Sequence, residues 1–146
     1  MPSVLLVDDH TYIRNGICYL IEGTTDIEVV ATASNGIEAV AKARLYQPHV
    51  VVIDISMPFM DGIEATKQIK NSCPSTRVLA LSIYDNQAYI EGALQAGAHG
   101  YVVKDAIATE LLDAIRSLHE GKRYFSHKIV SIIYPSRKND NDTWVA

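Results

Sequence analysis

The stretch Val50-Val51-Val52-Ile53-Asp54 decides the fold that we expect for this chain of 146 residues. Four consecutive apolar residues are followed at once by a carboxylate. A continuous apolar run, rather than an alternating one, is typical of a strand buried on both faces of a parallel sheet. The carboxyl ends of such strands line one crevice where ligands bind. The stretch therefore predicts an α/β sheet with a chemical group at its edge.

Four further apolar runs repeat this pattern, and helix-length segments separate them. Three of them also end in polar groups, namely Asp8-Asp9, Ser82 and Lys104. We expect a doubly wound α/β fold, because strand and helix alternate five times. The sheet should be parallel and five-stranded in the order 2-1-3-4-5, with five flanking helices, and the sequence is compatible with that order. The expected strands are 3–8, 27–33, 49–54, 76–82 and 99–103.

Apolar residues at helical spacing indicate which faces of three helices should pack on the sheet. The three stripes are Ile13, Ile17, Leu20 and Ile21; Ile37, Val40, Ala41 and Leu45; and Leu111, Leu112, Ile115 and Leu118.

Short polar residues mark the expected helix starts, and glycines mark the expected ends. Asn35 and Asp61 each precede a glutamate by three residues, as in a capping box. Asp85 and Asp105 are further N-cap candidates, and Gly97 and Gly121 lie where helices should stop. Residues 129–133 could add a helical turn or two, and 135–143 is polar and linker-like.

Composition excludes several classes of function. The formal net charge of -4 gives no basic face for nucleic acid, so we do not expect this chain alone to bind DNA. No segment is long and apolar enough to span a bilayer, and the N-terminus lacks a signal-peptide pattern. Cys18 and Cys73 are far apart and fit free thiols in a reducing compartment. We expect a cytoplasmic protein that does not associate with membranes.

The polar groups at the strand ends make one chemical centre if the sheet forms as expected. Clustered carboxylates repel one another and must find a cation or a proton. Asp8, Asp9 and Asp54 with Lys104 leave two uncompensated negative charges, which one Mg²⁺ would balance. His10 follows the acidic pair, and we expect it to pack at the start of the first helix rather than to bind a metal.

A carboxylate, a hydroxyl and a lysine beside Mg²⁺ suit phosphoryl transfer. The metal and the lysine neutralise the phosphoryl oxygens, and the hydroxyl of Ser82 donates a hydrogen bond. A carboxylate can attack phosphorus as a nucleophile. Asp54 is the best candidate because it ends the central strand, whereas Asp8 and Asp9 suit a metal-binding pair.

These motifs resemble the receiver domain of bacterial two-component response regulators over about residues 3–125. The resemblance implies a flavodoxin-like, CheY-like fold and a phosphoacceptor rather than an enzyme. Five motifs in the right order carry it: Val4-Leu5-Leu6-Val7-Asp8-Asp9-His10, Asp54-Ile55-Ser56-Met57-Pro58, Met60-Asp61-Gly62, Leu81-Ser82, and Ala96-Gly97-Ala98-His99-Gly100-Tyr101-Val102-Val103-Lys104-Asp105.

The resemblance also implies a role for each site residue. Asp54 would accept phosphate from a sensor histidine kinase. Asp8, Asp9, Asp54 and the backbone carbonyl of Ser56 would hold Mg²⁺. Ser82 and Lys104 would contact the phosphoryl group, and Tyr101 would be the aromatic residue that swings inward. A homodimer through helices 4 and 5, or 1 and 5, is a further implication.

Departures from the common pattern refine the class. Asp105 follows Lys104 where many receivers carry proline, and this pair resembles the NarL/FixJ subgroup. Members of that subgroup append a helix-turn-helix domain that binds DNA. We expect a receiver over residues 1–125 and a linker over 126–146 that leads to such a domain outside this chain. A natural stand-alone receiver, acting through protein contacts, is the alternative. Phe59 and Ile83 are bulky and could slow access to the phosphate site.

Three other classes remain as competing hypotheses. A haloacid-dehalogenase-like phosphatase would carry its aspartate nucleophile after the first strand, in an Asp-x-Asp motif. A flavodoxin-like electron carrier would need a phosphate loop there, where Asp8-Asp9 would repel the flavin phosphate. A degenerate receiver that only mediates contacts is disfavoured, because every site position is filled.

Overall fold

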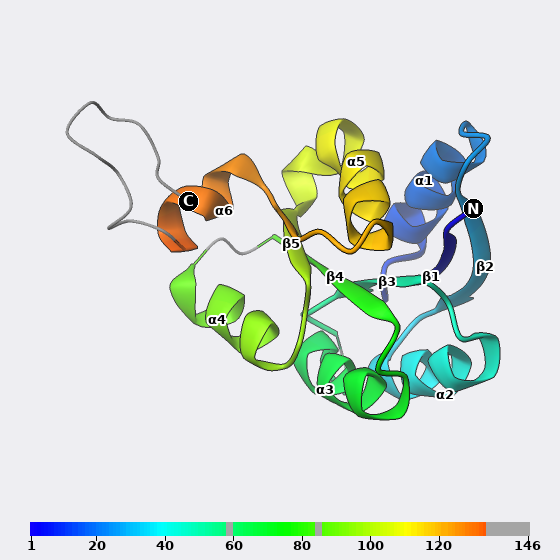
Figure 1. Ribbon diagram of the computed structural model, residues 1–146, viewed down its shortest axis with the longest axis horizontal. Helices are drawn as coiled ribbons and strands as arrows, with labels where there is room; N and C mark the ends of the chain where they lie inside the picture. Colours follow the sequence, from blue (N-terminus) through cyan, green and yellow to red (C-terminus); the bar gives the residue numbers. More distant parts are fainter. Residues whose placement is uncertain (58–59, 84–85, 134–146) are drawn as a thin grey trace.

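A parallel sheet with helices on both faces forms the centre of the computed structural model, which describes residues 1–57, 60–83 and 86–133 (Figure 1). The strand order is β2-β1-β3-β4-β5-β6. The predicted order of the first five strands is confirmed, and a short sixth strand extends the sheet beyond β5. The strands are β1 Ser3–Val7, β2 Glu28–Ala33, β3 Val50–Asp54, β4 Arg77–Ser82, β5 Gly100–Val103 and β6 Tyr124–Phe125.

The helices divide between the two faces of the sheet. Figure 1 shows α1 and α5 on one face and α2, α3 and α4 on the other. The helices are α1 Thr11–Glu22, α2 Gly36–Tyr46, α3 Gly62–Ser72, α4 Gln87–Gln95, α5 Ile107–His119 and α6 His127–Ile133, and a short 3₁₀ turn spans Lys104–Ala106. None of the helices in the described ranges is long and apolar enough to cross a bilayer.

The central strands are buried on both faces, as their continuous apolar runs predict. Leu6 and Val52 belong to the core layer that includes Ile17 and Ile115, on the side of α1 and α5. Their neighbours along the strands, such as Val51, pack in the opposite layer with α2, α3 and α4. Side chains alternate between faces along a strand, so a run without polar residues fills both layers.

Two of the predicted helix caps are confirmed, and one is wrong. The side chains of Asn35 and Asp61 accept hydrogen bonds from the backbone amides of Glu38 (2.8 Å) and Glu64 (2.9 Å). Asp105 does not cap α5, which begins after Ala106 without a side-chain cap. The 3₁₀ turn moves the start of α5 past Asp105.

The structure also describes the start of α4 and the ends of α4 and α5. Asp85 lies outside the described residues, and Asn86 caps α4 by accepting from the amide of Tyr89 at 3.1 Å. The expected stops hold, since α4 and α5 end just before Gly97 and Gly121, whose φ angles are 110° and 86°. These left-handed conformations favour glycine.

The predicted apolar stripe of α2 is wrong in part. Ile37 and Leu45 are 59% and 75% exposed. The buried face of this helix is made of small residues and one valine: Gly36, Ala39, Val40 and Ala43. Small residues allow the helix to lie close to its neighbours, and this turns the larger side chains outward.

The segment after α5 is part of the packed structure. Backbone and side-chain groups of Ser126 hydrogen bond to β5, and Ile129 is fully buried in the core. Ile132 lies with Ile90 and Leu94 along a groove between α6 and α4. The expected short helix near 129–133 is therefore confirmed as α6, and it lies against α4.

Candidate functional site

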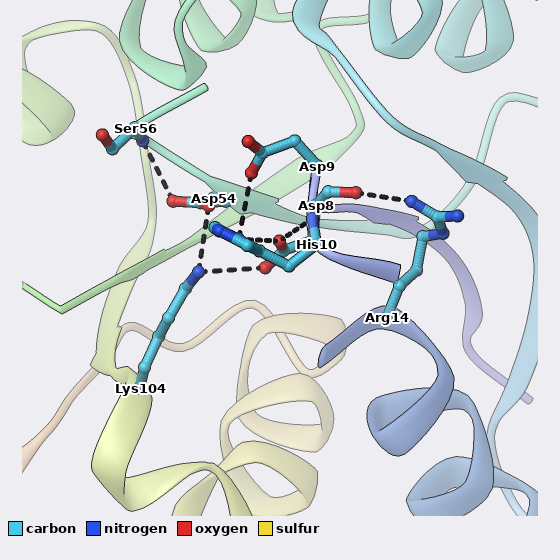
Figure 2. Close-up of polar contacts among 7 residues, drawn as sticks. All are labelled: Asp8, Asp9, His10, Arg14, Asp54, Ser56 and Lys104. Carbon is cyan, nitrogen blue, oxygen red and sulfur yellow. Dashed lines mark hydrogen bonds and ion pairs between the residues drawn. The ribbon is translucent and has the colours of Figure 1, made fainter. Parts of the chain in front are cut away.

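Three strand ends bring two buried carboxylates and an ammonium group together (Figure 2). Asp8 follows β1, Asp54 ends β3, and Lys104 follows β5. Lys104 Nζ donates a hydrogen bond to Asp54 Oδ2 at 2.9 Å and lies 3.1 Å from Asp8 Oδ2. The predicted convergence of β1, β3 and β5 is therefore present.

Asp9 and His10 complete the acidic side of this site. His10 Nδ1 lies 3.2 Å from Asp8 Oδ1 and 3.2 Å from Asp9 Oδ1. His10 is the N-cap residue of α1, and its backbone amide donates to Asp8 Oδ1 at 2.8 Å. Its side chain is 61% exposed, so it does not pack at the helix start as we expected. It turns toward the carboxylates instead.

The loop after β3 orients Asp54. The backbone amide of Ser56 donates to Asp54 Oδ1 at 3.0 Å, so both oxygens of this carboxylate have a partner. Gly62, the first residue of α3, lies directly against this turn. A larger residue would not fit, because a Cβ atom there would lie 2.2 Å from the carbonyl oxygen of Asp54. This close approach explains the glycine of the Met60-Asp61-Gly62 motif.

Burial and charge act on the two groups of the central ion pair. Burial raises the pKa of Asp54 above its ordinary value, although the Ser56 amide and Lys104 favour its anion. Burial lowers the pKa of Lys104, but the hydrogen bond and charge of Asp54, with a further contribution from Asp8, outweigh that effect and raise the pKa overall. The two neighbouring carboxylates therefore favour the charged form of Lys104.

The acidic groups fit a divalent cation. Ligand atoms of Asp8, Asp9, His10 and Asp54 all lie within 4.8 Å of one another. Asp8 Oδ2 and Asp9 Oδ1 are buried and accept no hydrogen bond, although each is near a nitrogen of Lys104 or His10. Buried carboxylate oxygens that lack hydrogen bonds are costly unless a cation compensates them. The arrangement is thus compatible with metal binding.

Ser82 and Tyr101 lie deeper in the structure. Both are fully buried, Ser82 at the end of β4 and Tyr101 within β5. In the parallel register Ser82 lies opposite Val103, the residue before Lys104. The predicted hydroxyl is therefore on the strand between Asp54 and Lys104, and the ring of Tyr101 is packed in the core.

Two features at the margin of the site were not foreseen. Arg14, on α1, donates from its guanidinium to the backbone carbonyl of Asp8 at 2.8 Å (Figure 2). A basic residue one turn after His10 was the only signal for this contact. A cavity of ≈ 170 Å³ also opens beside Lys104, lined by Ile83, Val103, Asp105 and Lys128. Ile83 is 70% exposed, and Phe59 lies outside the described residues.

Comparison with known proteins agrees with this geometry. Residues 4–116 match the family described as the response regulator receiver domain. The oxygen regulatory protein NreC of Staphylococcus aureus is 38% identical over 130 residues, which are 88% of this chain and 60% of that protein.

Solved structures show the same likeness. A LuxR-family response regulator from Aurantimonas sp. SI85-9A1 has a TM-score of 0.89 at 35% identity, covering 95% of this chain and 99% of that one. The RcsB response regulator of Salmonella typhimurium has a TM-score of 0.82 at 27% identity, covering 90% and 65%. RcsB has also been solved as two dimers bound to two parallel DNAs.

The chain belongs to the response regulator receiver domain family, with the CheY-like arrangement of strands and helices. Its relatives place it in the NarL/FixJ-type subgroup of two-component regulators. The chain spans about 60% of the length of the curated relatives it matches. Domains of this family generally act as phosphoacceptors, and this membership argues against the phosphatase and flavodoxin-like hypotheses.

Proposed function

We propose that this chain is a phosphoacceptor in which Asp54 receives a phosphoryl group from a sensor histidine kinase. The observation that carries the proposal is the contact of Lys104 Nζ with Asp54 Oδ2, beside two further carboxylates. A buried carboxylate next to a fixed cation can be approached by an anionic donor, because that cation offsets the negative charge of the incoming group.

The proposed step is a phosphoryl transfer. One oxygen of Asp54 attacks phosphorus and forms an acyl phosphate, while the bond from phosphorus to the donor nitrogen breaks. The electron pair of that bond remains on the histidine of the kinase. Lys104 would pair with the phosphoryl oxygens, and Ser82 would donate a hydrogen bond to one of them. Tyr101, the proposed aromatic switch residue, is already fully buried here and would keep this inward position in the phosphorylated chain.

Mg²⁺ is the cation that we propose for the acidic cluster. Asp8, Asp9, Asp54 and the carbonyl of Ser56 would hold it, and these oxygen donors are the type it prefers. When bound, it would neutralise charge on the transferring phosphoryl group.

The output of the switch is proposed to lie outside this chain. Its curated relatives are longer, and RcsB is solved in complex with DNA. A helix-turn-helix domain following residues 126–146 would then regulate transcription in the cytoplasm. A stand-alone receiver that acts through protein contacts is the second candidate.

Incubation with acetyl phosphate and Mg²⁺, followed by intact mass measurement, tests the phosphoacceptor. We expect one phosphoryl adduct on the wild-type chain. Asp54→Asn should show none, because it removes the attacking oxygen anion, and EDTA should suppress the adduct by removing the metal. Asp113→Asn, on the exposed face of α5, is the matched control and should be modified normally. A wild-type chain without an adduct would favour the degenerate receiver.

A further inference from the structure

The residues on both sides of Lys104 are held by the segment that follows α5. The buried backbone amide of Val103 donates to Ser126 Oγ at 3.1 Å. Asp105 forms an ion pair with Lys128, whose Nζ lies 2.9 Å from Asp105 Oδ2. Lys104 therefore sits between one buried hydrogen bond and one exposed ion pair, both made by the start of α6.

Ser126 makes a second contact with the same strand. Its backbone amide donates to the carbonyl oxygen of Tyr101 at 3.0 Å, and its own carbonyl accepts from the amides of Ile129 and Val130. Ser126 and Ile129 are both fully buried, so this junction is packed into the core. The first turn of α6 is thus tied to β5 through one residue.

From these contacts we infer that Ser126 and Lys128 are positioning residues for Lys104, so that α6 and the phosphoacceptor site are mechanically coupled. The side chain of Lys104 contacts two carboxylates of the site. Its backbone is held by the contacts of Val103 and Asp105 with the start of α6 and by the amide of Ile107, which donates to the Lys104 carbonyl oxygen. The cavity of ≈ 170 Å³ lined by Lys104 and Lys128 leaves room for this backbone to shift once an anchor is lost.

This coupling, which rests on the proposed function, acts in both directions, because a coupling free energy is reciprocal. A phosphoryl group added to Asp54 would move Lys104 Nζ from its present contact with Asp54 Oδ2, and this movement would pull on Val103 and Asp105, and through them on the start of α6. Since α6 leads to the remainder of the chain, the pull would reach an output domain through α6.

The test compares phosphorylation rates and Mg²⁺ affinities of the full chain and its variants. Ser126→Ala removes the acceptor for Val103 and should slow phosphorylation by acetyl phosphate about tenfold at saturating Mg²⁺, since small misplacements of a catalytic group cost rate steeply. Its Mg²⁺ affinity should stay within about twofold of wild type, because no metal ligand is touched. Ser126→Thr keeps the hydroxyl and should restore the rate. Ser131→Ala, an exposed serine of the same helix, is the matched control.

Charge-reversal variants of the exposed pair Asp105–Lys128 test the same inference if Ser126→Ala folds poorly. Lys128→Asp places like charges together at Asp105 and should slow phosphorylation about two- to fivefold, within the range of weak surface electrostatics. The double variant Asp105→Lys with Lys128→Asp should recover the wild-type rate. Lys122→Asp, which alters a different exposed ion pair, should have no effect.

The outcomes separate this inference from the proposed function. Wild-type rates in both Ser126→Ala and Lys128→Asp would overturn the inference alone, and so would a parallel loss of Mg²⁺ affinity in Ser126→Ala. A wild-type chain that takes no phosphoryl group would overturn the proposed function and the inference together.

Discussion

At the scale of single residues, one ammonium group organises the acidic centre. Lys104 Nζ lies within 3.1 Å of carboxylate oxygens from two different strands, and its side chain is only 10% exposed. Removing one partner of such a buried cluster leaves charges uncompensated, which generally costs more than the pair itself contributes. The same arrangement is consistent with the nucleophile role that we propose for the buried Asp54.

His99 gives a prediction at the opposite end of the sheet from the phosphoacceptor. Burial, with the positive charges of Lys70, Arg77 and Arg123, lowers its pKa to about 4. Its Nδ1 accepts a hydrogen bond from the backbone amide of Val78 at 3.4 Å, which requires the neutral ring. The unfolded chain, with an ordinary histidine pKa near 6.5, binds a proton more readily than the folded one.

We therefore expect His99 to make stability fall as the pH drops from about 6.5 to 4. Because this side chain is only part-buried, solvent screening reduces the expected loss to about 1–2 kcal/mol. Urea unfolding across this pH range should show a shallower dependence for His99→Gln than for wild type. His127→Gln, at an exposed position, should keep the wild-type slope. Identical slopes for His99→Gln and wild type would contradict the assignment.

At the scale of elements, the strands were predictable and the helix faces only partly so. Continuous apolar runs predicted the central strands, because burial on both faces leaves few polar positions, whereas β2 at the edge of the sheet is only partly buried and contains Glu28 and Thr32. The predicted apolar stripe of α2 was wrong in part, because this helix packs through small residues and leaves Ile37 and Leu45 exposed. The spacing of apolar residues predicts which face of a helix is hydrophobic. Which of those side chains are buried depends on how closely the backbone of the helix approaches its neighbours.

The features that the sequence did not reveal, namely β6 and the contacts of Arg14 and Lys128, are all matters of tertiary context. β6 has only two residues, too few for any periodicity, and it exists because β5 offers an open edge. The contacts of Arg14 and of Lys128 depend on where α1 and α6 come to lie. The acidic cluster itself was predictable, since topology alone brings the ends of β1 and β3 together.

Ile129 tests whether α6 is part of the folded receiver. Its side chain is fully buried with residues of the core, so Ile129→Ala should lower the free energy of unfolding by about 2–4 kcal/mol, as for other large-to-small core changes. Val130→Ala, at a half-buried neighbouring position, should cost less than about 1 kcal/mol. Chemical denaturation measures both. Equal, small effects would mean that α6 is only loosely attached.

At the scale of the whole molecule, β6 and α6 restrict how two copies can meet. The outer edge of β5 is paired with β6, and α4 is in contact with α6. The outer face of α1, by contrast, presents Tyr12 and Tyr19, which are 90% and 81% exposed. Of the two dimer arrangements implied by the resemblance, the one through helices 1 and 5 leaves α6 in place, and we favour it.

Tyr19→Lys should therefore prevent self-association of the phosphorylated chain. A lysine at the centre of such an apolar surface would have to be desolvated without a partner, which would weaken binding at least tenfold. Light scattering after size-exclusion chromatography, with acetyl phosphate and Mg²⁺ present, should show a wild-type dimer and a Tyr19→Lys monomer. Ile37→Lys alters an exposed apolar residue on α2 and should leave the dimer intact. A Tyr19→Lys dimer would favour the arrangement through helices 4 and 5.

The two residues of β6 have a practical consequence for anyone who shortens this chain. The family match ends at residue 116, before Tyr124 and Ser126 supply partners to the outer edge of β5. A fragment cut at that point would present bare amides and carbonyls along an apolar border, which is a template for adding strands from other molecules. The brief return of the chain to the sheet thus covers this edge, and we expect a fragment without it to aggregate more readily.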